Sequence, residues 1–130
     1  MISFAPTFPA SFANINCVTN FTASPTKQIV YTNETTRATI NYSGKVISCP
    51  RHAVYQLFSL TVTITFPNGT VTQVSNLPLA KGTLIISHRS LLDYGKWAIQ
   101  FRWVYEVTFS GLHQFYMGYA NSILVSKRGT

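Results

Sequence analysis

Three histidines, two cysteines and three carboxylates are the side chains of this sequence best suited to acid–base, nucleophilic or metal chemistry. They are His52, His88, His113, Cys17, Cys49, Glu34, Asp93 and Glu106. No two of the histidines have the spacing of metal ligands on one helix or in a zinc finger, and the cysteines lie far apart. The sequence contains neither a Gly-rich phosphate loop nor a nucleophile elbow, and it has few carboxylates for acid–base hydrolysis. We therefore predict a protein that is not an enzyme and that binds no metal and no cofactor.

Glycans and a disulfide are the modifications that the sequence predicts. Four Asn-x-Ser/Thr sequons are present, and each is an acceptor for an N-linked glycan. They begin at Asn20, Asn33, Asn41 and Asn68. Ordinary Thr-rich strands and turns are the alternative explanation of these triplets. Cys17 and Cys49 either form one bridge or remain two buried thiols.

The sequons and the cysteine pair bear on the compartment of the protein. Residues 1–10 lack the basic start and the continuous apolar run of a signal peptide, and no stretch is apolar for long enough to cross a bilayer. This leaves an intracellular protein or a mature ectodomain whose signal and anchor are left out of the chain. The sequons and cysteines favour the ectodomain, which would be extracellular, on the cell surface or in the ER lumen.

The chain is strongly basic. Ten Lys and Arg residues against three acidic residues give a net charge of +7 in 130 residues. This balance attracts nucleic acids, sulfated glycans and acidic protein surfaces over long range. The basic residues are dispersed, however, and no nucleic-acid-binding module is present. We therefore expect an acidic protein partner and no nucleic acid.

The elements that must position these residues are β-strands. The composition, with 46% hydrophobic and 14% aromatic residues, favours strands over helices. From Trp97 to Phe109 every second residue is apolar, which predicts a long central strand with one face in the core. The positions between them point the other way and include Lys96, Gln100, Arg102 and Glu106.

A second long strand is predicted over residues 54–66, with the even positions, among them Val54 and Phe58, on its core face. Shorter strands are predicted at 14–21, 28–32, 37–42, 45–49, 71–74 and 84–86, with turns at 23–26, at Ser43-Gly44 and, as type I′, at Asn68-Gly69. Ser110-Gly111 turns the chain into a last strand. In that strand one face is shared by Phe115, Met117, Tyr119, Ile123 and Val125. Residues 87–92 form at most one helical turn.

The stretch that begins at Asp93 resembles the corner before a central strand of immunoglobulin-like domains. The family pattern is Asp-x-Gly-x-Tyr-x-Cys. Asp93 and Gly95 match it, while Trp97 stands in place of the tyrosine and Ile99 in place of the cysteine. The predicted antiparallel strands, eight or nine in number, and the spacing of their turns indicate a sandwich or barrel over residues 13–130, and residues 1–12, with two prolines and no period, are predicted to be a flexible arm. The resemblance implies that this domain is a divergent, variable-type immunoglobulin-like β-sandwich. A sandwich of another topology is the alternative.

The two departures from that pattern carry expectations of their own. With Ile99 in place of the cysteine, apolar packing should join the two sheets at that point. Trp97 removes the hydroxyl that closes the corner in the family.

In such domains the sheet that carries the last two strands often presents its outer face to a partner. On the predicted pattern, that face is formed by Lys96, Gln100, Arg102 and Glu106 from one strand and by Gln114 and Tyr116 from the next. Arg and Tyr are residue types that anchor protein interfaces. A merely solvated face is the alternative.

The order of these parts, with the stretches 84–103 and 114–119, resembles the immunomodulatory membrane glycoproteins of adenoviruses (early region three) and cytomegaloviruses. The resemblance implies an ectodomain that holds a host cell-surface or antigen-presenting protein for immune evasion, without catalysis. One alternative is a host immunoglobulin-superfamily adhesion or immune-receptor domain. Another is a basic β-barrel that binds nucleic acid or a viral coat subunit. The sequence leaves open the partner, viral or host origin, and a homodimer.

Overall fold

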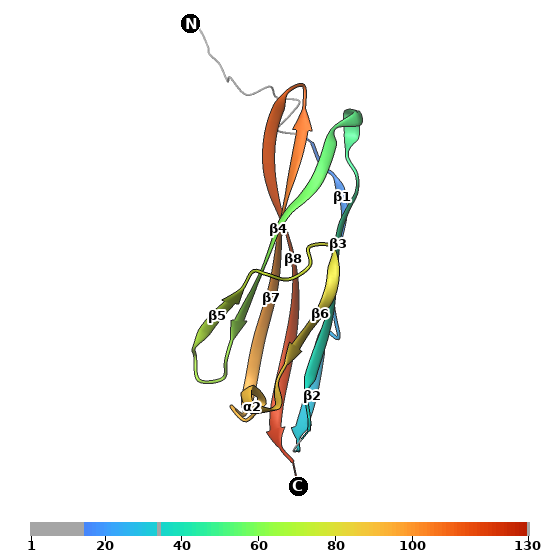
Figure 1. Cartoon of the computed structure of the whole chain (residues 1–130). Helices are drawn as coiled ribbons and strands as arrows, with labels where there is room; N and C mark the ends of the chain where they lie inside the picture. Colours follow the sequence, from blue (N-terminus) through green and yellow to red (C-terminus); the bar gives the residue numbers. More distant parts are fainter. Residues whose placement is uncertain (1–14, 34, 130) are drawn as a thin grey trace, which may run out of the picture.

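A computed structural model of the chain describes residues 15–33 and 35–129, which form two packed β-sheets (Figure 1). The described strands are β1 (Val18–Ser24), β2 (Lys27–Thr32), β3 (Ala38–Ser48), β4 (Val54–Thr65), β5 (Val71–Val74), β6 (Lys81–Ile86), β7 (Gly95–Phe109) and β8 (Leu112–Arg128). A 3₁₀ turn, η1 (Pro50–His52), and a single helical turn, α2 (His88–Leu91), complete the described elements. The prediction of an all-β sandwich is confirmed, and the arm predicted over residues 1–12 lies outside the described residues.

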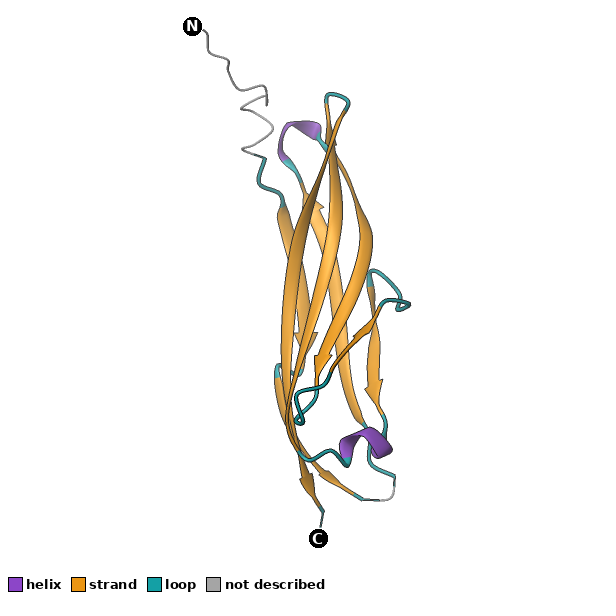
Figure 2. Cartoon of the chain, turned by 90° about the vertical axis from the view of Figure 1, so that its left-hand side faces the viewer, coloured by secondary structure: helices purple, strands orange, loops and turns teal. Residues whose placement is uncertain are grey.

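The strands form a three-stranded sheet of order β1-β3-β6 and a five-stranded sheet of order β2-β8-β7-β4-β5. The chain passes from the first sheet to the second between β1 and β2, and β2 then pairs with β8 in parallel. We had predicted a purely antiparallel sandwich from the sequence, and the parallel pair of β2 and β8 corrects that prediction. β7 and β8, the two longest strands, run nearly the whole length of an elongated molecule (Figures 1 and 2).

The long hairpin of β7 and β8 supplies much of the core between the two sheets. Trp97, Phe101 and Trp103 on β7 are each at most 1% exposed, so the predicted alternation is confirmed. Ile99 is buried in the same core cluster as Ile40 of β3, in the other sheet. Apolar packing therefore joins the sheets at the position where the immunoglobulin pattern has a cysteine.

β3 is one continuous strand, so the turn predicted at Ser43-Gly44 is wrong. A Cβ added to Gly44 would overlap the Trp103 indole and the Phe21 ring. The glycine therefore admits two large aromatic side chains instead of bending the chain. The side chain of Trp103 is held in this position by a hydrogen bond of 2.8 Å from its Nε1 to the Leu79 carbonyl.

β4 carries a β-bulge that corrects its predicted core face. Leu57 pairs with Tyr105 and Ser59 pairs with Val104, so Phe58 is the extra residue between two successive pairs. The bulge turns Phe58 outward, where it is 58% exposed. The even positions therefore face the core only from Leu60 onward, and Val54 is 68% exposed.

The turn between β4 and β5 lies where it was predicted but has another geometry. Gly69 has φ +91°, whereas Asn68 is not among the residues with positive φ. A type I′ turn needs positive φ at both central residues, so that prediction is wrong. The Gly69 amide donates to the Phe66 carbonyl at 2.9 Å, and the Thr70 amide donates to the Asn68 side-chain oxygen at 2.8 Å.

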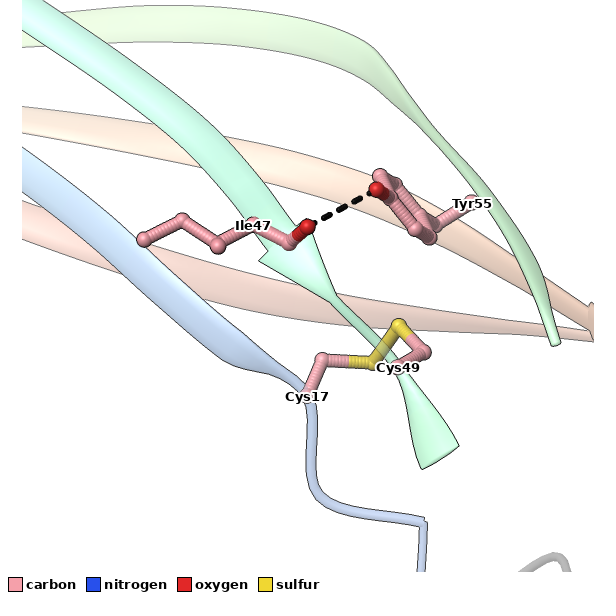
Figure 3. The surroundings of a disulfide bond; sticks show 4 residues. All are labelled: Cys17, Ile47, Cys49 and Tyr55. Atoms are coloured by element: carbon pink, nitrogen blue, oxygen red, sulfur yellow. Dashed lines mark hydrogen bonds between the residues drawn. A yellow bond between two sulfur atoms is a disulfide. The ribbon is translucent and has the colours of Figure 1, made fainter. Parts of the chain in front are cut away.

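Cys17 and Cys49 form a disulfide, which settles the choice that the sequence left open (Figure 3). The bridge joins the residue just before β1 to the residue just after β3. Beside it, the Tyr55 hydroxyl donates to the Ile47 carbonyl at 2.9 Å. Both cysteines pack against a second core cluster, which consists of Ile15, Val46, Ala53, Tyr105 and Val107. Among the described residues, no helix has the length and apolar character needed to cross a membrane.

Candidate protein-binding face

The five-stranded sheet has an outer face, the side turned away from the three-stranded sheet. Because the core residues of β7 have odd numbers, its even-numbered side chains lie on the outer face. β8 pairs with β7 in an antiparallel register in which Arg102 is opposite Tyr119, and Glu106 is opposite Phe115. The outer face of β8 is therefore made of odd-numbered residues.

Four of the six predicted partner-binding residues lie on this face. Lys96 and Gln100 are exposed, and Arg102 and Glu106 are half-buried. The structure thus brings the β7 part of the predicted surface together along one strand.

Gln114 and Tyr116 do not lie on the outer face, and this part of the prediction is wrong. Tyr116 points inward and stacks on the buried Tyr105 with 5.6 Å between ring centroids. The reason is the two-residue turn at Ser110 and Gly111, which pairs Phe109 with Leu112. Directly paired residues point to the same side of a sheet, so even positions of β7 share a face with odd positions of β8.

The outer face instead carries exposed apolar side chains that the sequence had not assigned to a surface. We call this set the apolar patch, and it consists of Phe58, Phe115, Met117 and Tyr119, which are 58%, 52%, 56% and 48% exposed. The rings of Phe58 and Phe115 meet edge to face, with centroids 5.1 Å apart. The Tyr119 hydroxyl lies 3.2 Å from the Met117 sulfur. The patch is continuous across β4 and β8, and such patches on a protein surface mark interaction sites.

A shallow hollow lies beside the apolar patch, further along the same face. Its lining consists mainly of short side chains and amides from three adjacent strands: Thr63, Thr65, Ala98, Gln100, Asn121 and Ile123. A second depression continues it across β8 to β2 and is lined by Lys27, Gln28, Ile29, Ile123 and Val125. The outer face therefore combines large apolar side chains in one half with a depression in the other.

The charged groups of this face are mostly cations. Glu106 is the acidic residue that the described chain places on it, and its two carboxylate oxygens are each 3.1 Å from a neighbour, one from Gln56 Nε2 and the other from His113 Nδ1. Lys96 and Arg102 lie on the same strand. The Arg102 Nε is buried and has no hydrogen-bond partner within the described part of the chain.

The four sequon asparagines are all exposed, and none lies on the outer face. Asn20 on β1 and Asn41 on β3 point away from the core on the three-stranded sheet. Asn33 follows β2 in a turn, and Asn68 lies at the tip of the β4–β5 turn. If these sites carry glycans, sugar covers one sheet and two loops and leaves the apolar patch bare.

Across residues 15–33 and 35–129 there is no group of three or more His, Cys, Asp or Glu side chains that could hold a metal ion. In comparisons with known proteins, no family model matches the sequence and no curated protein matches it.

Proposed function

We propose that this chain is a variable-type immunoglobulin-like ectodomain that binds another protein through the outer face of its five-stranded sheet, without catalysis. Strand order supports the fold assignment. β1, β3 and β6 occupy the positions of strands A, B and E, whereas β4, β7 and β8 occupy those of C, F and G. β5 then takes the position of C′, the strand that variable-type domains add to the C-F-G sheet.

The observation that carries the binding role is the apolar patch. Burying one large apolar side chain contributes about 1.5–3 kcal/mol, so leaving four of them in water on one continuous surface is unfavourable unless a partner covers them. Two of the four are phenylalanines and one is a tyrosine, and aromatic residues are enriched at interface cores. The predicted sugar on the other sheet adds a second reason, since a glycan-covered surface is a poor docking site.

Two further observations bear on the partner. The cationic side chains beside the patch and the net charge of +7 favour an acidic surface, which would also speed encounter through electrostatic steering. The resemblance to adenoviral and cytomegaloviral glycoproteins favours a host cell-surface or antigen-presenting protein, bound for immune evasion. On this proposal the domain works in the extracellular space, on the cell surface or in the ER lumen, where disulfides persist.

A screen against receptor ectodomains tests the proposal. The chain is secreted from mammalian cells with its glycans, and binding is measured on an array of human cell-surface ectodomains. Each hit is remeasured with Met117→Glu and with Ile85→Glu. Ile85 on β6 is 55% exposed, nearly the same as Met117, but lies on the three-stranded sheet, so it is a matched control.

We expect Met117→Glu to abolish binding and Ile85→Glu to leave it unchanged. If Ile85→Glu abolished binding to a hit and Met117→Glu left it unchanged, the interface would lie on the three-stranded sheet, and the proposal would be overturned. Thermal unfolding of both variants checks that the substitutions act on the surface alone.

A further inference from the structure

We infer that the apolar patch is covered by a second copy of this chain, in a two-fold dimer in which β7 packs across β7 of the other copy in the opposite direction. The inference rests on the proposed function, because it uses the same outer face, which the second copy covers when no receptor is bound. It follows from the sheet register, which places complementary groups at equal distances on either side of one point of the face.

That point is Phe101 on β7 and its paired residue Ala120 on β8. The two-fold axis that we infer lies in the plane between the two copies, is perpendicular to the strands and passes over this point. It places each strand against the same strand of the other copy, which runs in the opposite direction. Residues equally far from the axis then face each other across the interface. Sheets that pack face to face keep their strand directions within about 30° of each other, and this arrangement satisfies that rule.

The apolar contacts of this arrangement match large groups with small ones or with the hollow. On β7, Val104 lies opposite Ala98 of the second copy, and Ala98 lines the hollow. On β8, Met117 lies three residues before Ala120, and Ile123 lies three residues after it. Met117 of one copy therefore faces Ile123 of the other. Each patch therefore enters the depression of the other copy, and both depressions are filled at once.

The polar contacts match as well. Glu106 and Lys96 are equally far from Phe101, so each copy sets its carboxylate against the ammonium of the other, and the dimer gains two ion pairs. Arg102 falls opposite Gln100, whose amide oxygen can accept from the guanidinium. The alternative axis, parallel to the strands, sets Glu106 against Glu106 and Arg102 against Arg102, which is repulsive.

The size of the face suits a stable dimer. Ten residue steps from Lys96 to Glu106 span about 33 Å, and β4, β7 and β8 at about 4.8 Å spacing are about 14 Å wide. The shorter β2 and β5, of six and four residues, widen the face at the Lys96 end, so its area is about 600 Å² per copy. This is at the lower end of what a standard protein interface buries on each side. A self-associated domain and a receptor complex would then compete for one surface.

Charge exchange on the glycosylated, secreted chain tests this inference. Dimerisation is measured by sedimentation equilibrium for Lys96→Glu, for Glu106→Lys, for the double variant and for an equimolar mixture of the two single variants. Each single variant replaces two ion pairs by two repulsions, so we expect the dimer to weaken about tenfold or more. The double variant restores both pairs and should dimerise like the wild type. The mixture should form heterodimers, because one variant then has two acidic ends and the other two basic ends.

Glu106 also accepts from Gln56 and His113, so Glu106→Lys could disturb the fold. Glu106→Gln is therefore included as a milder variant, and it should weaken the dimer less. Thermal unfolding is measured for each variant.

A wild type that stays monomeric up to about 100 μM would overturn the inference, since standard interfaces are populated at that concentration. So would a dimer that both single variants leave intact. A monomer that still binds a receptor in a Met117-dependent way would leave the proposed function standing, so the two failures can be told apart.

Discussion

The indole Nε1–H of Trp97 donates a hydrogen bond of 3.1 Å to the Ser126 hydroxyl, and both side chains are 1% exposed. The same hydroxyl donates to the Asp93 carbonyl at 3.0 Å. These two bonds join β7, β8 and the corner that precedes β7. Trp97 lacks the hydroxyl of the family's tyrosine, but it takes part in closing this corner through Ser126.

Replacing Ser126 by alanine should destabilise the domain by about 1–3 kcal/mol, because it leaves a buried indole donor and a carbonyl without partners. The free energy of unfolding, obtained from urea titration, measures the loss. Ser24→Ala on β1 is the matched control, since Ser24 is an exposed strand serine, and it should have little effect. A loss below about 0.5 kcal/mol for Ser126→Ala would mean that this linkage contributes nothing.

The disulfide should account for a large share of the stability. Cys17 and Cys49 are separated by 32 positions, and closing a loop of this size is worth about 3–4 kcal/mol in the chain-entropy treatment. We expect Cys17→Ser combined with Cys49→Ser to lower the free energy of unfolding by that amount. Reduction of the wild type with dithiothreitol should reproduce the value. Equal stability of the oxidised and reduced chains would contradict the prediction.

Much of the fold follows from alternation, which worked where large side chains meet a dense core. β7 was predicted correctly because its odd positions are bulky and apolar from Trp97 to Phe109. The β4 bulge was missed because Phe58 is as apolar as the core residues around it, so composition gives no sign that it faces solvent. Gly44 was misread as a turn because local propensity favours one, whereas the space taken by Trp103 explains the glycine.

The candidate site was predicted in part: the β7 residues were assigned to the correct face and the β8 residues were not. The error on β8 has a geometric cause. The β7 residues were placed correctly because one alternating strand fixes both of its faces. The β8 residues were not, because the face of a second strand depends on the number of residues in the turn between them. Ser110 and Gly111 have φ of 51° and 78°, the two positive values of a two-residue type I′ turn. Reading Ser110-Gly111 in this way would have placed Phe115 and Met117 outside.

Alkaline pH should destabilise the domain through two tyrosines. Burial raises the pKa of Tyr42 above 10.0. For Tyr105, burial raises the pKa, and the nearby Tyr116 phenolate raises it further. The folded state therefore holds these protons more tightly than the unfolded state does. The stability they contribute is complete below about pH 10 and is lost as pH rises through the raised values.

Urea unfolding measured between about pH 9 and pH 12 checks this sign, because stability must fall as the tyrosines ionise. Tyr105→Phe keeps the ring and removes one ionisable group, so its stability should decline less steeply over this range. A slope identical to that of the wild type would show that Tyr105 ionises equally easily in both states.

A glycan added to the outer face should block binding by steric exclusion. Asn121 is exposed on β8 and lines the hollow, and it is followed by Ser122 and Ile123. Ile123→Thr therefore creates a sequon at the centre of the face with one substitution.

We expect the secreted Ile123→Thr variant to gain the mass of one glycan and to lose both self-association and receptor binding. Ile123→Val, which has the shape of threonine but forms no sequon, should retain both. Enzymatic removal of the sugar chain from the Ile123→Thr variant should restore much of the binding, because only the side chains at positions 121 and 123 then differ from the wild type. Full binding by the glycosylated variant would show that the partner docks elsewhere, since a sugar chain on the central strands leaves no room for a second protein surface.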